Sequence, residues 1–142
     1  MTQQEQQKYD GPVPIPQQES DFYWEKCKEH ELWLRHCKAC DKAYFYPRDI
    51  CPLCFSRDTD WIQASGKGTL YTFGLVHQKP RPTYTGPLPF VIAMVELEEG
   101  PIMPTNIVDV DATPEALKVG MSVEVTFDDI TESISLPKFK PS

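Results

Sequence analysis

The sequence lacks three features that would place it in common classes of protein. No stretch approaches about 18 consecutive apolar residues, so the sequence predicts no membrane-spanning helix. The first seven residues are polar and contain no apolar core of a signal peptide, and we therefore expect a cytoplasmic protein. Basic residues are scarce, 14 against 21 acidic ones, and the formal charge of −7 argues against a general nucleic-acid binder, which needs cations to contact phosphates.

Proline, by contrast, is abundant. The chain has 14 prolines in 142 residues, about twice average usage, and this excess disfavours a helix bundle because an interior proline destabilises a helix by about 3 kcal/mol. A hydrophobic fraction of 40% is nevertheless enough for a core. Prolines at positions 12, 14 and 16 predict that residues 1–18 form an extended arm.

One short helix and a series of strands are expected after the arm. Ser20 predicts the cap of a helix from Asp21 to His30, whose large apolar side chains, Phe22, Tyr23 and Trp24, require a surface to pack against. Leu32 and Leu34 then begin a strand pattern, and one helical turn is expected between Thr113 and Gly120. The remaining segments with strand composition are residues 69–77, 90–97, 102–110, 122–127 and 132–136.

Four of the five cysteines form two C-x₂-C pairs separated by ten residues. A C-x₂-C turn directs two sulfur atoms at one cation, and two such turns joined by a hairpin close a tetrahedral site. Cys37, Cys40, Cys51 and Cys54 are therefore the predicted ligands of one structural Zn²⁺, with iron in a rubredoxin-like site as the alternative. A zinc ribbon of this size has little core of its own, so the metal would supply its folding energy.

The fifth cysteine allows two interpretations. Cys27 and His30 would share a face of the predicted helix and could act as nucleophile and base, but nothing in the sequence supplies an oxyanion hole. A packed apolar thiol is the preferred interpretation of Cys27. His36 is not expected to replace a cysteine ligand, and His77 is expected to be structural.

Five strands with a helical turn before the fourth predict a small closed barrel of the OB type. Gly66 and Gly68 are interpreted as a tight turn between ribbon and barrel, not as a dinucleotide motif, because no helix follows them. Residues 61–95 contain no acidic side chain and carry a net charge of +3, although ordinary solvated loop charges would explain this as well. From charge alone, Lys67, Lys79, Arg81 and Lys138, the last in a basic C-terminal tail, are candidates for attracting a phosphorylated small molecule into a cleft.

The ordered set of these motifs resembles the DUF35 family, small proteins with a rubredoxin-like zinc ribbon followed by an acyl-CoA-associated OB-fold. The resemblance covers about residues 20–141 and rests on segments that include Phe22-Tyr23-Trp24, both cysteine pairs, Ser65 to Tyr71, Val91 to Leu97 and Phe139-Lys140-Pro141. DUF35 proteins accompany thiolase-superfamily enzymes, and the catalytic cysteine and histidines of such complexes belong to the larger subunit.

The expected fold is therefore mainly β, with an N-terminal helix and Cys₄ zinc ribbon followed by a five-stranded OB-fold barrel. The expected units are the arm (1–18), helix and ribbon (19–64) and the OB-fold (65–142). The resemblance implies a non-catalytic subunit that binds one zinc ion, shares coenzyme A or acyl-CoA with its partner, and joins a thiolase-like catalytic subunit in a hetero-oligomer, expected to be α2β2. With that ligand and that partner, Lys67, Lys79, Arg81 and Lys138 become the charge-based candidates for coenzyme A contacts, and Phe22, Tyr23 and Trp24 are expected to contact the partner. Thiolysis of a 3-oxoacyl-CoA is the first expectation, then retro-aldol cleavage of a steroid side chain, then condensation; a single-stranded nucleic-acid-binding OB module is the alternative of another class.

Overall fold

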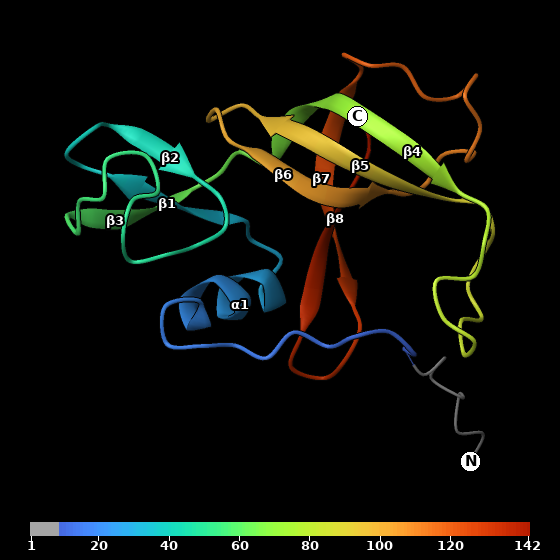
Figure 1. Cartoon of the computed structure of the whole chain (residues 1–142), viewed down its shortest axis with the longest axis horizontal. Helices are drawn as coiled ribbons and strands as arrows, with labels where there is room; N and C mark the ends of the chain where they lie inside the picture. Colours follow the sequence, from blue (N-terminus) through green and yellow to red (C-terminus); the bar gives the residue numbers. More distant parts are fainter. Residues whose placement is uncertain (1–8) are drawn as a thin grey trace.

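The structure is a computed structural model that describes residues 9–142, and it consists mainly of strands (Figure 1). Strands β1 to β3 form an antiparallel sheet in the order β2-β1-β3, and the other five close a barrel in the order β4-β5-β6-β8-β7. The predicted fold class is confirmed, because within residues 9–142 one short helix and a cysteine ribbon precede a closed five-stranded barrel of the OB kind. The elements are α1 (Asp21–Lys28), β1 (Trp33–Cys37), β2 (Lys42–Tyr44), β3 (Thr59–Gln63), β4 (Lys67–Val76), β5 (Phe90–Leu97), β6 (Ile102–Ile107), β7 (Ser122–Asp129) and β8 (Ser135–Pro141).

The segment before the helix has no regular secondary structure between residues 9 and 17 and runs past α1 and the β7–β8 hairpin (Figure 1). Ser20 stands at the N-cap position, but its side chain does not cap α1 as predicted. Its hydroxyl instead accepts a hydrogen bond from the Gln17 N–H at 3.0 Å, which stabilises the turn that leads into the helix. The first part of the predicted arm, residues 1–8, lies outside the described residues.

Helix α1 ends two residues earlier than predicted because His30 adopts a left-handed conformation with φ of +62°. The N–H groups of His30 and Glu31 donate to the carbonyls of Cys27 and Lys26, both at 2.9 Å. These two bonds form the Schellman pattern that terminates helices, with histidine at the position that glycine usually occupies. The chain then turns directly into β1.

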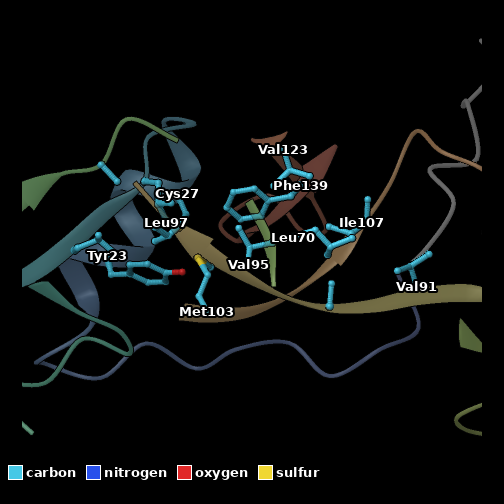
Figure 2. Close-up of a cluster of buried hydrophobic side chains, with 14 of the residues drawn as sticks. Tyr23, Cys27, Leu70, Val91, Val95, Leu97, Met103, Ile107, Val123 and Phe139 are labelled. Atoms are coloured by element: carbon cyan, nitrogen blue, oxygen red, sulfur yellow. The ribbon is translucent and has the colours of Figure 1, made fainter. Parts of the chain in front are cut away.

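The core is continuous from the helix into the barrel. In β5 the buried side chains alternate strictly, with Val91, Ala93, Val95 and Leu97 facing inward. Figure 2 shows Tyr23 and Cys27 of α1 beside barrel residues, and all of these belong to one buried cluster. The helix is therefore packed into the core of its own chain and contributes to barrel stability.

The last strand lies further along the chain than predicted. We expected residues 132–136 and a basic tail after them, but β8 runs from Ser135 to Pro141 and pairs with β7 throughout its length. The Val108 N–H, directly after β6, donates to the Phe139 carbonyl. Backbone polar groups point to the same side of a strand at every second residue, so those of Pro137 and Pro141 also point toward β6. β8 pairs with β6 at one position, Ile107 with Phe139. The prolines have no N–H, but the hydrogen bonds between β8 and β7 come from the residues between them, so none of those bonds is lost.

The helical turn expected between Thr113 and Gly120 is only a hydrogen-bonded turn. The Ala116 N–H donates to both the carbonyl and the side-chain oxygen of Thr113, each at 3.3 Å. The predicted capping interaction of Thr113 therefore forms, but no helix follows it. Leu117 is buried in the barrel core, and Gly120 has φ of +90°, so the chain leaves helical conformation after one turn.

Candidate metal centre and barrel cavity

The four predicted ligand cysteines converge at the end of the ribbon. Cys37 ends β1, Cys40 lies in the β1–β2 loop, and Cys51 and Cys54 lie in the loop between β2 and β3. Their sulfur atoms all lie within 4.8 Å of one another, with Sγ–Sγ distances of 3.5 Å for Cys37–Cys54 and 3.8 Å for Cys40–Cys51. Sulfur atoms about 2.3 Å from a tetrahedral Zn²⁺ would be about 3.8 Å apart. The geometry therefore fits one tetrahedral thiolate-bound metal ion.

The two cysteine turns share a backbone device. In each, the residue directly after the second cysteine is left-handed: Asp41 has φ of +56° and Phe55 has φ of +64°. In the second turn, the Phe55 N–H donates to the Cys51 carbonyl at 2.9 Å and the Leu53 N–H donates to the Cys51 sulfur at 3.4 Å. The chain thus reverses direction tightly enough to bring both sulfur atoms of a pair to one side.

The sulfur cluster is electrostatically suited to a cation. Burial, together with the neighbouring thiols, raises the pKa of Cys40 to about 12. Burial also acts to raise the pKa of Cys51, but the N–H donors of Cys54 and Leu53 outweigh it and lower the pKa to about 7. One thiolate therefore forms readily, whereas four adjacent thiolates require a cation to offset their repulsion. Four cysteines leave no open coordination position, so a metal here would be structural rather than catalytic.

His36, next to the cluster, uses both ring nitrogens in hydrogen bonds to aspartates. Its Nδ1 lies 2.9 Å from an Asp60 oxygen and its Nε2 lies 2.8 Å from an Asp41 oxygen. The hydrogen bonds to Asp41 and Asp60 raise the pKa of His36 because they favour the protonated ring. The imidazole thus has no free nitrogen for a metal, as the sequence led us to expect.

Cys27 is fully buried in α1, and burial raises the pKa of its thiol to about 12. His30 has left the helix, and its ring lies against Phe127 with Nε2 2.9 Å from an Asp129 oxygen. A thiol that remains protonated at neutral pH, with its candidate base bound to another group, does not form an activated nucleophile. His77, expected to be structural, is exposed directly after β4.

The three aromatic side chains proposed to contact a partner are mostly used within the chain. Tyr23 and Trp24 are buried, and the Trp24 Nε1–H donates to the Tyr46 hydroxyl at 3.1 Å. Phe22 is half-buried between Trp33 and Trp61, with ring centroids 5.3 and 4.8 Å away. Of the three, Phe22 keeps the most exposed surface, because the helix packs its other large apolar side chains into the core.

The four candidate cations do not lie together. Arg81 and Lys138 line one cavity at the end of the barrel, whereas Lys67 lines a separate hollow with Glu96, Glu98 and Ser142. Lys67 and the loop that carries Arg81 stand at opposite ends of β4, about 30 Å of extended strand apart. Lys79 is exposed and contacts neither site.

Both cations of the barrel cavity are already paired with carboxylates of this chain. Arg81 binds Asp10, and the Lys138 Nζ lies 2.7 Å from an Asp128 oxygen. Two further acids, Asp109 and Asp111, line the cavity as well. Sequence reasoning missed these acids because they lie outside the acid-free stretch of residues 61–95, and no local pattern connects them to it.

No helix in the described part of the chain is both long and apolar enough to cross a lipid bilayer.

Two family models match the chain. One, described as the rubredoxin-like zinc ribbon domain of ChsH2, matches residues 24–60, and the other, described as the C-terminal OB-fold domain of ChsH2, matches residues 61–128. They meet near the end of the ribbon sheet, between β3 residues Asp60 and Trp61. Together they account for the cysteine cluster and most of the barrel.

Curated relatives carry related descriptions. A DUF35 domain-containing scaffold protein of Methanocaldococcus jannaschii is 41% identical over 112 residues, which are 77% of this chain and 77% of the relative. A probable enoyl-CoA hydratase alpha subunit of Thermomonospora curvata is 32% identical over 131 residues, 92% of this chain. The chain spans only 40% of the length of that hydratase subunit.

A solved structure extends the comparison to three dimensions. The structure described as the Ltp2-ChsH2(DUF35) aldolase superposes with a TM-score of 0.77 at 32% identity. The match covers 91% of this chain and 98% of that one. The similarity therefore extends over ribbon and barrel together.

Proposed function

Because the chain belongs to the DUF35 family of zinc-ribbon and OB-fold proteins, we propose that it is a non-catalytic subunit of an acyl-CoA enzyme complex. The observation that carries this proposal is the similarity to the ChsH2(DUF35) aldolase chain over nearly the full length of both chains. The chemistry of the described residues agrees with it. The cysteine cluster leaves no open metal position, and Cys27 lacks an activating base.

The catalytic partner is proposed to be a thiolase-superfamily subunit that forms a hetero-oligomer with this chain. Retro-aldol cleavage next to an acyl-CoA carbonyl now ranks first among the candidate reactions, because the similar solved structure is described as an aldolase. Thiolysis of a 3-oxoacyl-CoA ranks second. Hydration of an enoyl-CoA is a further candidate, since one similar protein is described as a hydratase alpha subunit.

The cysteine cluster is proposed to bind one structural Zn²⁺. When bound, the ion supplies no reaction step; it offsets the charge of four thiolates and holds the two cysteine turns together. Cys37 and Cys40 would bind it from the first turn and Cys51 and Cys54 from the second. Metal analysis of the purified chain should find one zinc or iron per molecule, and a folded chain without metal would contradict this assignment.

Coexpression with the thiolase-superfamily proteins of the same genome tests the proposed partner. One of them should co-elute with this chain on size exclusion, and the complex should consume acyl-CoA. Product analysis separates the reactions. Retro-aldol cleavage of a hydroxyacyl-CoA gives a free ketone or aldehyde and one acyl-CoA, thiolysis consumes free coenzyme A and gives two acyl-CoA molecules, and hydration of an enoyl-CoA gives a hydroxyacyl-CoA. Turnover in the complex should be unchanged by Cys27→Ala.

Absence of any partner, together with binding of single-stranded oligonucleotides at physiological salt, would contradict the proposal and favour the nucleic-acid alternative. The pairing of Arg81 and Lys138 with carboxylates argues against that alternative, because an oligonucleotide groove requires several free cations. Anisotropy of a labelled oligonucleotide measures this directly.

A further inference from the structure

The cavity at one end of the barrel is lined by strand residues and by three connecting segments that are far apart in the sequence. The β4–β5 loop contributes Arg81 and Tyr84, residues 108–112 follow β6, and Tyr9 comes from the N-terminal segment. In Figure 1 the β4–β5 loop and the first described residues lie at the same end of the molecule. The cavity volume is about 590 Å³, within the range of sites that bind small organic molecules.

Asp10 occupies a small anion receptor at the rim of this cavity. Its carboxylate accepts hydrogen bonds from the Arg81 guanidinium through Nη2 and from the Thr85 backbone N–H at 3.1 Å. The Nε–H of Arg81 donates to the Asp10 carbonyl at 3.0 Å, and the guanidinium lies 5.3 Å from the Tyr84 ring centroid. A guanidinium beside a backbone N–H is a typical arrangement for binding one phosphate or carboxylate group.

The neighbouring glycine fits the same arrangement. A Cβ atom at Gly11 would lie 2.4 Å from the Tyr9 hydroxyl and 3.0 Å from the Arg81 Nη2. The absence of a side chain at Gly11 therefore lets Arg81 approach the backbone closely. Residues 9–11 thus contact Arg81 through both a carboxylate and the main chain, although about 70 residues separate them in sequence.

The remaining groups of the cavity indicate which kind of molecule could replace Asp10. Tyr84 and Phe90 form an aromatic wall, with ring centroids 5.6 Å apart. Asp109 and Asp111 offer carboxylates that accept hydrogen bonds from hydroxyl or amino groups. Lys138 remains bound to Asp128, so only Arg81 would be free for an anion once Asp10 leaves.

We infer that the Arg81 guanidinium and the Thr85 N–H form the phosphate subsite of a cavity for a phosphorylated nucleoside, and that Asp10 fills this subsite when the ligand is absent. The aromatic wall suits a base, the two acids suit its amino and hydroxyl groups, and the vacated receptor accommodates one phosphate. Binding therefore requires exchange of the Asp10 carboxylate for the ligand phosphate. The identification of the ligand with the nucleotide end of coenzyme A, rather than with a free nucleotide, rests on the proposed function.

The test is an NMR titration of the full chain with coenzyme A, adenosine 3′,5′-bisphosphate or pantetheine, which lacks phosphate. The amide signals of Gly11 and Thr85 report release of Asp10 from the receptor. We expect coenzyme A and the bisphosphate to shift both signals, and pantetheine to leave them unchanged. Asp10→Asn keeps an acceptor for the Thr85 N–H but removes the competing charge, and should tighten binding about two- to fivefold, as expected for a partly exposed ion pair.

Two further variants make the result specific. Arg81→Gln should abolish the phosphate-dependent shifts and remove any gain from Asp10→Asn in the double variant. Asp58→Asn changes the net charge equally on an exposed ribbon position and should leave binding unchanged. A shift with the free bisphosphate but not with coenzyme A would retain the site and assign it to a free nucleotide.

Failure of the inference is distinct from failure of the proposed function. If Asp10→Asn binds neither phosphate-bearing probe, or if Arg81→Gln binds coenzyme A as well as the wild type does, the inference is wrong. Asp10 would then only hold the segment against the loop. Either result leaves the catalytic partner to be judged by co-elution and turnover.

Discussion

The cysteine turns and the barrel are stabilised in different ways although they lie in one short chain. Around the cysteine turns, the buried cluster consists of Cys37, Tyr44 and Cys51, with Cys40 packed against it. The barrel and α1 share a large apolar cluster that includes Leu70, Val95 and Phe139, as shown in Figure 2. The first region has hydrogen-bonded turns and the cysteine cluster proposed to bind a metal ion, whereas the second depends on burial of apolar surface.

The boundary between these two kinds of stabilisation does not follow the order of the chain. Leu32 and Leu34, at the start of the ribbon, are buried in the barrel cluster together with α1. Only the far end of the ribbon, beyond the middle of β1, has the small separate cluster. The helix and the first half of β1 are therefore stabilised by the same apolar core as the barrel.

Metal removal should separate the two regions most strongly. Cys51→Ser, or excess chelator, should unfold residues 37–58, because structural zinc contributes about 10–16 kcal/mol of apparent binding free energy in small zinc domains. Amide signals from that segment should collapse while those of Val95 and Phe139 persist. Cys27→Ala is the matched control and should leave the metal content at one per chain. Simultaneous loss of both sets of signals would show that the regions form one cooperative unit.

The converse change removes a large side chain from the barrel. Phe139 is fully buried, and Phe139→Ala should lower the free energy of unfolding by about 3–5 kcal/mol through lost contacts and a cavity. Urea unfolding followed by circular dichroism measures the loss. Ile92→Ala, at a position that is 49% exposed, should cost far less. Comparable losses in the two variants would contradict the assignment of the core.

The junction between the regions is Gly66, which has φ of +82°. An added Cβ would lie 2.6 Å from Val125 Cγ1, so Gly66→Ala should combine backbone strain with a side-chain clash. Gly120 has a similar φ of +90° but nothing within 4 Å of an added Cβ, so Gly120→Ala measures strain alone. We expect about 1–2 kcal/mol for Gly120→Ala and clearly more for Gly66→Ala, measured by urea denaturation. Equal losses would show that Val125 moves aside freely.

A smaller effect is expected where α1 contacts the β7–β8 hairpin. Asp129 accepts hydrogen bonds from Ser135 and His30, which lower the pKa of its carboxyl below the usual 3.8. Because the folded-state pKa is lowered, the stabilisation is complete above about pH 4 and is lost as the pH falls through the folded value. Asp129→Asn should therefore cost no more than about 1 kcal/mol at pH 7, since the carboxylate is half exposed. The difference from wild type should shrink in acid, and thermal melts across pH measure it; a constant difference would point to a role other than charge.

Local patterns predicted the parts of the structure that depend on near neighbours. The C-x₂-C spacing fixes which sulfur atoms can meet, and the alternation in β5 fixes which side chains face the core. The predicted end of the helix was wrong because a left-handed His30 is unusual, and the last strand was placed too early because two prolines made it look like a tail. Those prolines are tolerated because their backbone nitrogens point toward β6, which pairs little with β8, and not toward β7, which pairs with β8 throughout.

The sequence by itself determined which four cysteines come together, the mainly β character and the family, because these depend on residue types at short, fixed spacings. Only the tertiary structure decided that Tyr23 and Trp24 are buried within the chain and that Lys67 lies far from Arg81. It also decided that Arg81 binds Asp10. Such pairings join residues far apart in sequence, and they depend on how the barrel closes and where its loops then lie, which no local spacing encodes.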